Sequence, residues 1–389
     1  MNKIDSFFTL LRVFFPLALL VSVALFRVYF EAGKPVENVL VEGVVWNHPY
    51  FEDTYQVIKV GETYVRTSWY PKYHIGDYLK VETGKTYYPH IYVNEEKSLK
   101  ILRKLSSIRN WAIQRVKVAL PEPHASLVLG MTLGYQGAYT EKFDQLLKDS
   151  GTMHIIVVSG YNVSLVAGFI GIIFAQWGRK MFGVFSIVCL ILYLGIVGFD
   201  PPVLRAIIMG ISAILALSKG ENAKSLYVLA VTVCVLLIIH PAFLHNLSFL
   251  MSVTATTAVI LASKITSGSG VIIRSLAVLI LVNLAIFPIT SFYFGRVSLV
   301  SPITNLLVLW IVPLVTIAGF VLIFVPILPI TLIILVLLDY FILVISYFGS
   351  IEGLVYEYTL SIAQIVVYYF VLLWLAYFVD ILLRRNRNV

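Results

Sequence analysis

The sequence predicts a polytopic α-helical membrane protein with about ten spans and one small all-β domain outside the membrane. Of its 389 residues, 59% are hydrophobic and 13% are charged, and the mean hydropathy is +0.89. These values exclude an ordinary soluble globular protein. Beyond about residue 154 almost the whole chain consists of apolar runs of span length. Residues 37–93, by contrast, alternate between polar and apolar side chains with a period of two.

The first span is predicted near residues 7–29, as an uncleaved signal-anchor helix within an anchor segment of residues 1–30. A short start bearing Lys3 precedes the apolar run, and no small-residue cleavage site occurs before Arg27. Nine further spans are expected near residues 154–176, 182–199, 202–218, 225–239, 246–263, 275–295, 301–325, 327–347 and 362–383. The shorter segments can serve because flanking residues snorkel toward the interface.

Basic residues of the short loops gather on one side of these spans. They are Lys3, Arg12, Arg179, Lys180, Lys219, Lys224, Lys264, Arg274, Arg384, Arg385 and Arg387. The opposite loops carry Asp200, Glu352 and Glu357, with Arg296 as the one basic exception. By the positive-inside rule, both termini lie in the cytoplasm and residues 31–120 lie outside the cytoplasmic (inner) membrane.

The all-β domain is expected within residues 31–96. Five stretches show the alternation that half-buried strands require: NVLVEGVVW, TYQVIKV, TYVRTSW, DYLKVETG and HIYVN. The Gly-Asp turn of HIGDYLKVETG and the later glycine are consistent with an OB-type barrel. Between Val36 and Glu96 there are five basic and nine acidic residues, a net charge of −4. This acidity is unfavourable for binding a polyanion without help.

A basic amphipathic helix is predicted over residues 97–117, in a region of interfacial helices that extends to about residue 150. The segment carries seven basic residues and no acid, with apolar residues on its other face. Pro121 and Pro123 end it. Four of its side chains are expected to contact either DNA phosphates or anionic lipids, and both interpretations stay open: Lys100, Arg103, Lys104 and Arg109.

Four blocks of the membrane part, residues 151–389, and of the segment before it carry a family resemblance. They are LVLGMTLGYQGAYTEKFDQLLKDSGTMHIIVVSGYNVSLVAG, DPPVLRAIIMGISAILAL, HPAFLHNLSFLMSVTATTAVIL and SPITNLLVLWIVPLV, in that order. With this order and spacing, the chain resembles the ComEC competence family over roughly residues 35–325. The resemblance implies an inner-membrane channel that passes single-stranded DNA into the cytoplasm during natural transformation, with an extracytoplasmic OB domain.

Two departures from the family pattern shape the expectation. Asn162 stands where the family has a histidine two residues after a Ser-Gly pair, so this side chain keeps a donor but cannot titrate. The metallo-β-lactamase-like nuclease domain of many members is missing after Val389. We therefore expect no enzymatic activity in the chain itself. The expected partners are single-stranded DNA, membrane lipids, a separate nuclease, a DNA receptor and cytoplasmic motor proteins, and the resemblance also admits a homo-oligomer.

Polar residues at the edges of spans are the candidates for the DNA path, because hydrocarbon disfavours a polar group that protein or water does not satisfy. His154, Ser159 and Asn162 offer hydrogen-bond donors, and Gly160 permits close backbone approach. In GFDPPVLRAIIMG, Arg205 lies about one turn inside a span, where its planar fork can hold a phosphate.

Asn246 and Ser252, from a polar cluster at the start of another span, complete the predicted path. The alternatives are structural: serine and asparagine can join helices, and Asp200 can pair with Arg205. Asp339 is the one acid deep in a predicted span. We expect it to pair with an arginine or lysine, or to take part in proton coupling.

No cofactor, metal site or disulfide is expected. The sequence contains no HExxH, HxHxDH, Walker or GxSxG motif, and its two cysteines, Cys189 and Cys234, lie in apolar runs. Two alternative functions remain open. The chain can be a membrane transporter or scaffold that uses the same fold for a ligand other than nucleic acid, which the acidic β domain and the missing nuclease domain favour. The weaker alternative is a binding module for the cell envelope.

Overall fold

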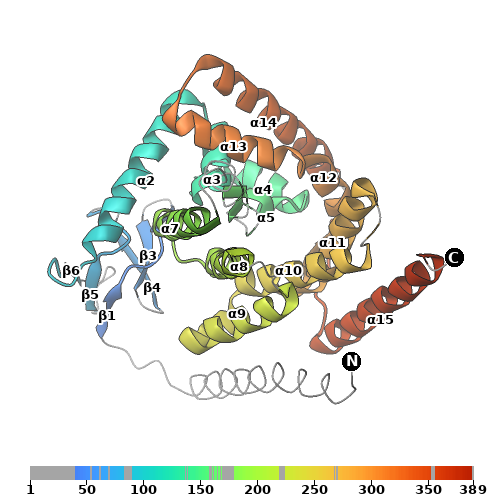
Figure 1. Ribbon diagram of the computed structural model, residues 1–389. Coiled ribbons are helices and arrows are strands. Elements are labelled where there is room, and N and C mark those ends of the chain that lie inside the picture. The colour runs from blue at the N-terminus through green and yellow to red at the C-terminus, as the bar shows by residue number, and fades with distance from the viewer. Residues whose placement is uncertain are drawn as a thin grey trace, which may run out of the picture.

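The computed structural model describes most of the chain beyond residue 39. The described residues are 40–52, 55–60, 63–68, 71–82, 90–135, 137, 139–156, 160, 162–163, 165–166, 168, 179–218, 224–266, 268, 270–351 and 355–387. The predicted anchor helix and Ser159 lie outside them. Figure 1 shows β strands at one corner of the molecule and helices over the rest.

Six short strands occupy the predicted β region and form two three-stranded antiparallel sheets. One sheet has the order β1 (Leu40–Val44), β5 (Tyr78–Glu82), β6 (His90–Val93); the other has the order β2 (Tyr50–Glu52), β3 (Tyr55–Val60), β4 (Thr63–Ser68). An isolated bridge between Val45 and Val60 links the sheets. Five of the strands match the predicted stretches, whereas β2 was not predicted. Closure into an OB-type barrel stays a prediction.

The inward residues of these strands form one core, as the alternation predicted. Ile58, Val60, Leu79 and Val81 are fully buried in a cluster that also contains Val45. In the β1–β5 pair Val41 lies opposite Val81, so apolar residues of neighbouring strands meet on the same face. The result is a small β unit with its own apolar interior.

Helices make up most of the described chain. They are α2 (Lys100–Ala119), α3 (His124–Leu133), α4 (Glu141–Asp149), α5 (Met153–Ile156), α7 (Arg179–Val197), α8 (Pro201–Ser218), α9 (Ser225–Ile239), the 3-10 turn η2 (Pro241–His245), α10 (Leu247–Ile265), α11 (Val271–Phe294), α12 (Ser301–Val308), α13 (Ile311–Phe324), α14 (Leu328–Gly349) and α15 (Ile362–Arg387). The largest core surrounds α3, where nine of ten residues are buried among α2, α13 and α14. A two-stranded sheet pairs β7 (Arg296–Ser298) with β8 (Val355–Glu357).

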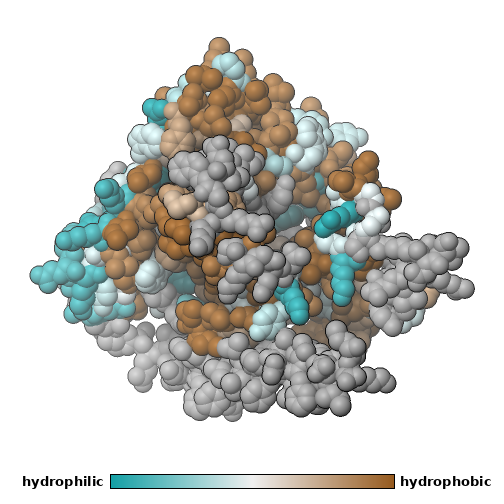
Figure 2. Space-filling model, in the orientation of Figure 1, coloured by the Kyte–Doolittle hydropathy of each residue, from teal (hydrophilic) through white to brown (hydrophobic). Residues whose placement is uncertain are grey.

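In the described part of the chain, three helices are long and apolar enough to cross a membrane by themselves: α10, α11 and α14. A fourth span arises if α12 and α13 are counted as one. Large apolar side chains remain exposed on many helices, and Figure 2 shows hydrophobic residues over the α13–α14 apex, with hydrophilic residues at the β corner. The membrane class is therefore supported, while the count of ten spans stays a prediction.

The predicted span 301–325 is not one straight helix. It breaks between α12 and α13, which meet at an angle of 46°. Pro313 explains the break locally, because it has no N–H to donate to the carbonyl of Leu309 and its ring clashes with that carbonyl in a continuous helix.

The β unit is fixed to the turn between α7 and α8. The Trp46 ring packs edge-on against Phe199, with centroids 5.1 Å apart. Asn47 Nδ2 donates to Asp200 Oδ1 over 2.5 Å, and His48 Nε2 lies 2.8 Å from the Ile196 carbonyl oxygen. Asp200, one of the predicted outward residues, therefore contacts the β unit.

Candidate functional site

Arg205 is the centre of the candidate site. Two prolines begin α8, as Pro favours the first turn of a helix, and they place Arg205 one turn inside it. The side chain is only 6% exposed. Its Nε donates to Ser252 Oγ on α10 over 2.8 Å, and its Nη1 lies 3.5 Å from Met209 Sδ. Within the described part of the chain no carboxylate lies at ion-pair distance, so the predicted alternative of an Arg205–Asp200 pair is not formed.

Gly160 provides the space in which the guanidinium lies. A Cβ built on Gly160 would stand 2.2 Å from Arg205 Nη2, closer than any real Cβ contact. The glycine at this position in the sequence therefore allows the backbone to approach the arginine closely, as its lack of a side chain predicted.

Asn162 lies two residues further along and is completely buried. Neither its Nδ2 nor its Oδ1 has a hydrogen-bond partner among the residues that the structure describes. An unsatisfied buried polar group costs about 1–3 kcal/mol. The amide thus lies two residues along the chain from the glycine that contacts Arg205, and a polar ligand that reached it would satisfy its donors and acceptor.

The other predicted path residues are placed differently. Ser252 holds Arg205, as described above. Asn246 caps α10, since its Oδ1 accepts a hydrogen bond of 3.0 Å from the Phe249 N–H. His154 lies exposed on α5, and Ser159 is outside the described residues. The structure thus brings together Gly160, Arg205 and Ser252, and gives Asn246 a capping role.

The arginines of α2 make contacts that Lys100 and Lys104 do not. Arg109 was predicted to face DNA or lipid, but it is 5% exposed and donates from Nε and Nη2 to the Leu133 carbonyl oxygen at the end of α3. Arg103 pairs with Asp77, Nε to Oδ1 3.1 Å, and with Glu95. Lys100 and Lys104 are exposed. Of the four predicted contacts, the two lysines are therefore exposed, Arg103 is half-buried in ion pairs, and Arg109 is buried.

A model of the family described as "Competence protein" matches residues 131–381, which is more than half of the chain and includes Gly160, Asn162, Arg205 and Ser252. The chain belongs to the competence protein family. The α2 lysines of this competence protein lie before the matched region.

Three relatives are similar over about half of this competence protein. ComE operon protein 3 of Bacillus subtilis is 25% identical over 208 residues, covering 52% of this chain and 27% of the relative. The uncharacterized protein YcaI of Escherichia coli is 24% identical, covering 51% of the chain and 28% of the relative. An uncharacterized protein of Aquifex aeolicus is 24% identical, covering 56% and 51%. The aligned part thus spans about a quarter to a half of the relatives' lengths. No solved structure matches the chain.

Two polar contacts in this competence protein were not predicted as pairs. Asp339 on α14 lies 2.8 Å from His124 Nε2 at the start of α3, so its partner is a histidine rather than the expected arginine or lysine. Asn305 Nδ2 donates to Asn283 Oδ1 over 2.9 Å, joining α12 to α11. Sequence separation hides such pairs, since each residue alone gives no signal of its partner.

Proposed function

We propose that this competence protein forms a membrane path for single-stranded DNA and that Arg205 binds the phosphates as they pass. The buried guanidinium, which has no carboxylate at ion-pair distance among the residues that the structure describes, carries this proposal. A buried charge is costly unless it is paired, and a phosphate supplies the missing charge together with acceptors for the planar fork.

The surroundings of Arg205 support this role. Ser252 uses the Nε–H and so fixes the plane of the guanidinium, while Gly160 keeps one side of it free of a side chain. Asn162 offers two further donors from a buried amide with no partner among the described residues. Phosphate hydration can be replaced only where several donors converge in a protein-lined passage.

The name of the Bacillus subtilis relative and the family description support DNA uptake as the setting. In this proposal the chain lies in the cytoplasmic membrane with both termini inside and the β unit outside. It is a channel without enzymatic activity, and separate nuclease, receptor and motor proteins act on the DNA before and after it. Lys100 and Lys104 attract the strand electrostatically, since the β unit is acidic.

The test compares two substitutions of Arg205 in cells that take up labelled DNA. A hydrogen bond to a charged group contributes about 1.5–3 kcal/mol, so Arg205→Ala should lower transport roughly 10- to 100-fold. Arg205→Lys should be nearly as damaging, because lysine keeps the charge but loses the fork. Surface binding of DNA should persist in both, and Asp200→Asn serves as the control that leaves Arg205 untouched.

Three outcomes would count against the proposal. Full transport with Arg205→Lys would make the fork unnecessary. Normal DNA uptake after deletion of the whole gene would remove the nucleic-acid reading and favour the alternative, a transporter or scaffold for another ligand. A loss of the protein from the membrane in both variants would show that Arg205 is needed for folding. Ser252→Ala then tests the transport role separately, because it removes the partner of the guanidinium and leaves Arg205 in place.

A further inference from the structure

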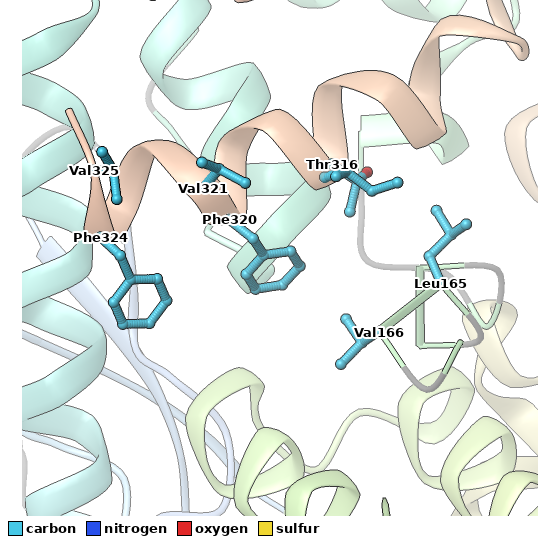
Figure 3. Close-up of a pocket in the computed structure, with 8 residues that line it drawn as sticks. Leu165, Val166, Thr316, Phe320, Val321, Phe324 and Val325 are labelled. Carbon is cyan, nitrogen blue, oxygen red and sulfur yellow. The ribbon is translucent and has the colours of Figure 1, made fainter. Parts of the chain in front are cut away.

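An apolar cavity of about 270 Å³, open on one side, lies along α13. In Figure 3 the rings of Phe320 and Phe324 project from α13 into it, and Val166 lies on the opposite wall. Apart from the hydroxyl of Thr316 its lining is apolar. An enclosed apolar cavity of about 150 Å³ can stay free of water and bind an apolar ligand, and a pocket that opens toward lipid offers the same apolar lining to a lipid chain. The occupant that fits this space is therefore a hydrocarbon group.

The cavity is elongated along the helix. Thr316 and Phe324 both line it and are eight residues apart on α13, which corresponds to about 12 Å of helix. A flexible chain fits such a space better than a compact ring system does.

The Phe324 end of the cavity meets α2. The Trp111 and Phe324 ring centroids are 6.2 Å apart, and the Arg115 guanidinium lies over the Trp111 ring at 5.4 Å. Arg115 also donates to the last carbonyls of α13, from Nε to Ile323 at 3.4 Å and from Nη2 to Phe324 at 3.5 Å. These long bonds use two of the five N–H groups of the fork, so donors remain for a further acceptor.

Exposed apolar side chains surround this corner, where α2 approaches the α13–α14 turn (Figure 1). Val118 is 89% exposed, Phe324 and Leu328 are each 69% exposed, and Trp111 is 45% exposed. A cation and a tryptophan at the border of apolar surface are typical of residues that meet lipid headgroups. The helix α2 contains no acidic residue, so the local charge favours an anionic headgroup.

We propose that the cavity binds one anionic phospholipid, whose phosphate meets Arg115 beside Trp111 and whose acyl chain passes Phe324 and lies along α13. The lipid joins α2 to α13 and contacts Val166, four residues beyond the buried Asn162. This binding does not depend on whether the chain transports DNA.

The experiment uses the full chain in phosphatidylcholine bilayers that contain brominated phosphatidylglycerol or brominated phosphatidylcholine. Bromine on the acyl chain quenches nearby tryptophan fluorescence, and Trp111→Phe identifies the part of the signal that comes from Trp111. Brominated phosphatidylglycerol should quench Trp111 at a several-fold lower mole fraction than brominated phosphatidylcholine does. Equal quenching by both lipids would overturn the proposal.

Two variants on the same helix locate the lipid. Val321→Phe fills the cavity and should abolish the preference for phosphatidylglycerol, whereas Leu314→Phe, on the exposed face of α13 outside the cavity, should keep it. Native mass spectrometry should likewise find one phosphatidylglycerol retained by the wild-type chain and by Leu314→Phe, but not by Val321→Phe. A preference that survives Val321→Phe would place the lipid elsewhere. If Val321→Phe does not fold, the wild-type comparison of the two headgroups still decides.

Discussion

Single residues in this protein show that polar side chains of distant segments are placed in pairs. His124 and Asp339 are 215 positions apart, yet Nε2 and Oδ1 lie at 2.8 Å. The histidine side chain is 13% exposed and the aspartate 70% exposed, on a helix whose other residues include no further acid. The pair therefore gives the one carboxylate of α14 a hydrogen-bond donor at the middle of an apolar helix, where an isolated charge is costly.

We predict that Asp339→Asn is better tolerated than Asp339→Leu. The asparagine keeps an oxygen that can accept from His124 Nε2, whereas leucine leaves the imidazole without that partner, a loss of about 1–3 kcal/mol. The melting temperature of the protein in detergent should fall more for Asp339→Leu than for Asp339→Asn. Combining Asp339→Leu with His124→Ala should cost less than the sum of the single changes, because the partners are in contact. Strictly additive shifts would show that the two side chains do not interact.

At the scale of secondary-structure elements, the side chains of α2 divide into those that pack against neighbouring elements and those that are exposed. Its buried stripe, Ser106, Arg109, Ala112, Ile113 and Val116, faces α3, α7 and α13. Arginines fasten this helix to its neighbours: Arg109 to the end of α3, Arg115 to the end of α13 and Arg103 to the β unit. Because carbonyls at helix ends lack helical partners, a guanidinium placed there satisfies them directly.

We expect arginine and lysine substitutions in α2 to separate stability from binding. Arg109→Gln should lower the melting temperature, because it removes the donor that bonds to Leu133, and changes of about 1–3 kcal/mol are typical for such losses. Lys100→Gln combined with Lys104→Gln should leave the melting temperature unchanged. The double variant should instead weaken binding to single-stranded DNA or to anionic vesicles, with a smaller salt dependence than the wild type has. An Arg109→Gln variant that kept its melting temperature but bound DNA more weakly would support the predicted contact of Arg109 with DNA.

Helix α2 could be predicted from the sequence, and so could most of the residues on its buried face. Arg109 lies three and four positions before Ala112 and Ile113, so helical spacing already puts it on the apolar face. Only its charge places Arg109 in the predicted contact set with the exposed lysines. The break between α12 and α13 also had a local signal in the sequence, the proline at position 313. The partners of Asp339 and Arg205, however, come from distant segments, and neither residue type nor spacing identifies them. The alternation of the strands was predicted because it depends only on neighbouring residues.

At the scale of the whole molecule, the β unit contacts the helices at the start of α2, through Arg103 and Asp77, and at the α7–α8 turn. Asn47 and Asp200 meet there, so the β unit and this turn must lie on the same side of the membrane. The β7–β8 pair likewise places Arg296 opposite Glu357 in strand register. Arg296 was the single basic residue among the loops predicted to face outward, and an acidic residue of the same side lies directly across the strand pair from it.

The whole-molecule prediction is the orientation of the chain. In intact cells a cysteine introduced at Thr83, between β5 and β6 in the sequence, should react with a membrane-impermeant thiol reagent, and one at Asn386 should react only after the cells are opened. The two native cysteines provide the background, because Cys234 is buried and Cys189 is half-buried in an apolar helix. If Asn386→Cys reacted in intact cells and Thr83→Cys did not, the orientation would be the opposite of the predicted one.

The separation of fastening arginines from outward lysines on α2 has an evolutionary side. If Lys100 and Lys104 attract a polyanion as proposed, their substitution changes that attraction without loss of the fold, because both side chains are exposed. Natural drift can then adjust the attraction to the salinity of a habitat. The arginines offer no such freedom, since each holds a neighbouring element in place. To strengthen or weaken polyanion binding, one would therefore substitute Lys100 and Lys104 first and keep the three arginines unchanged.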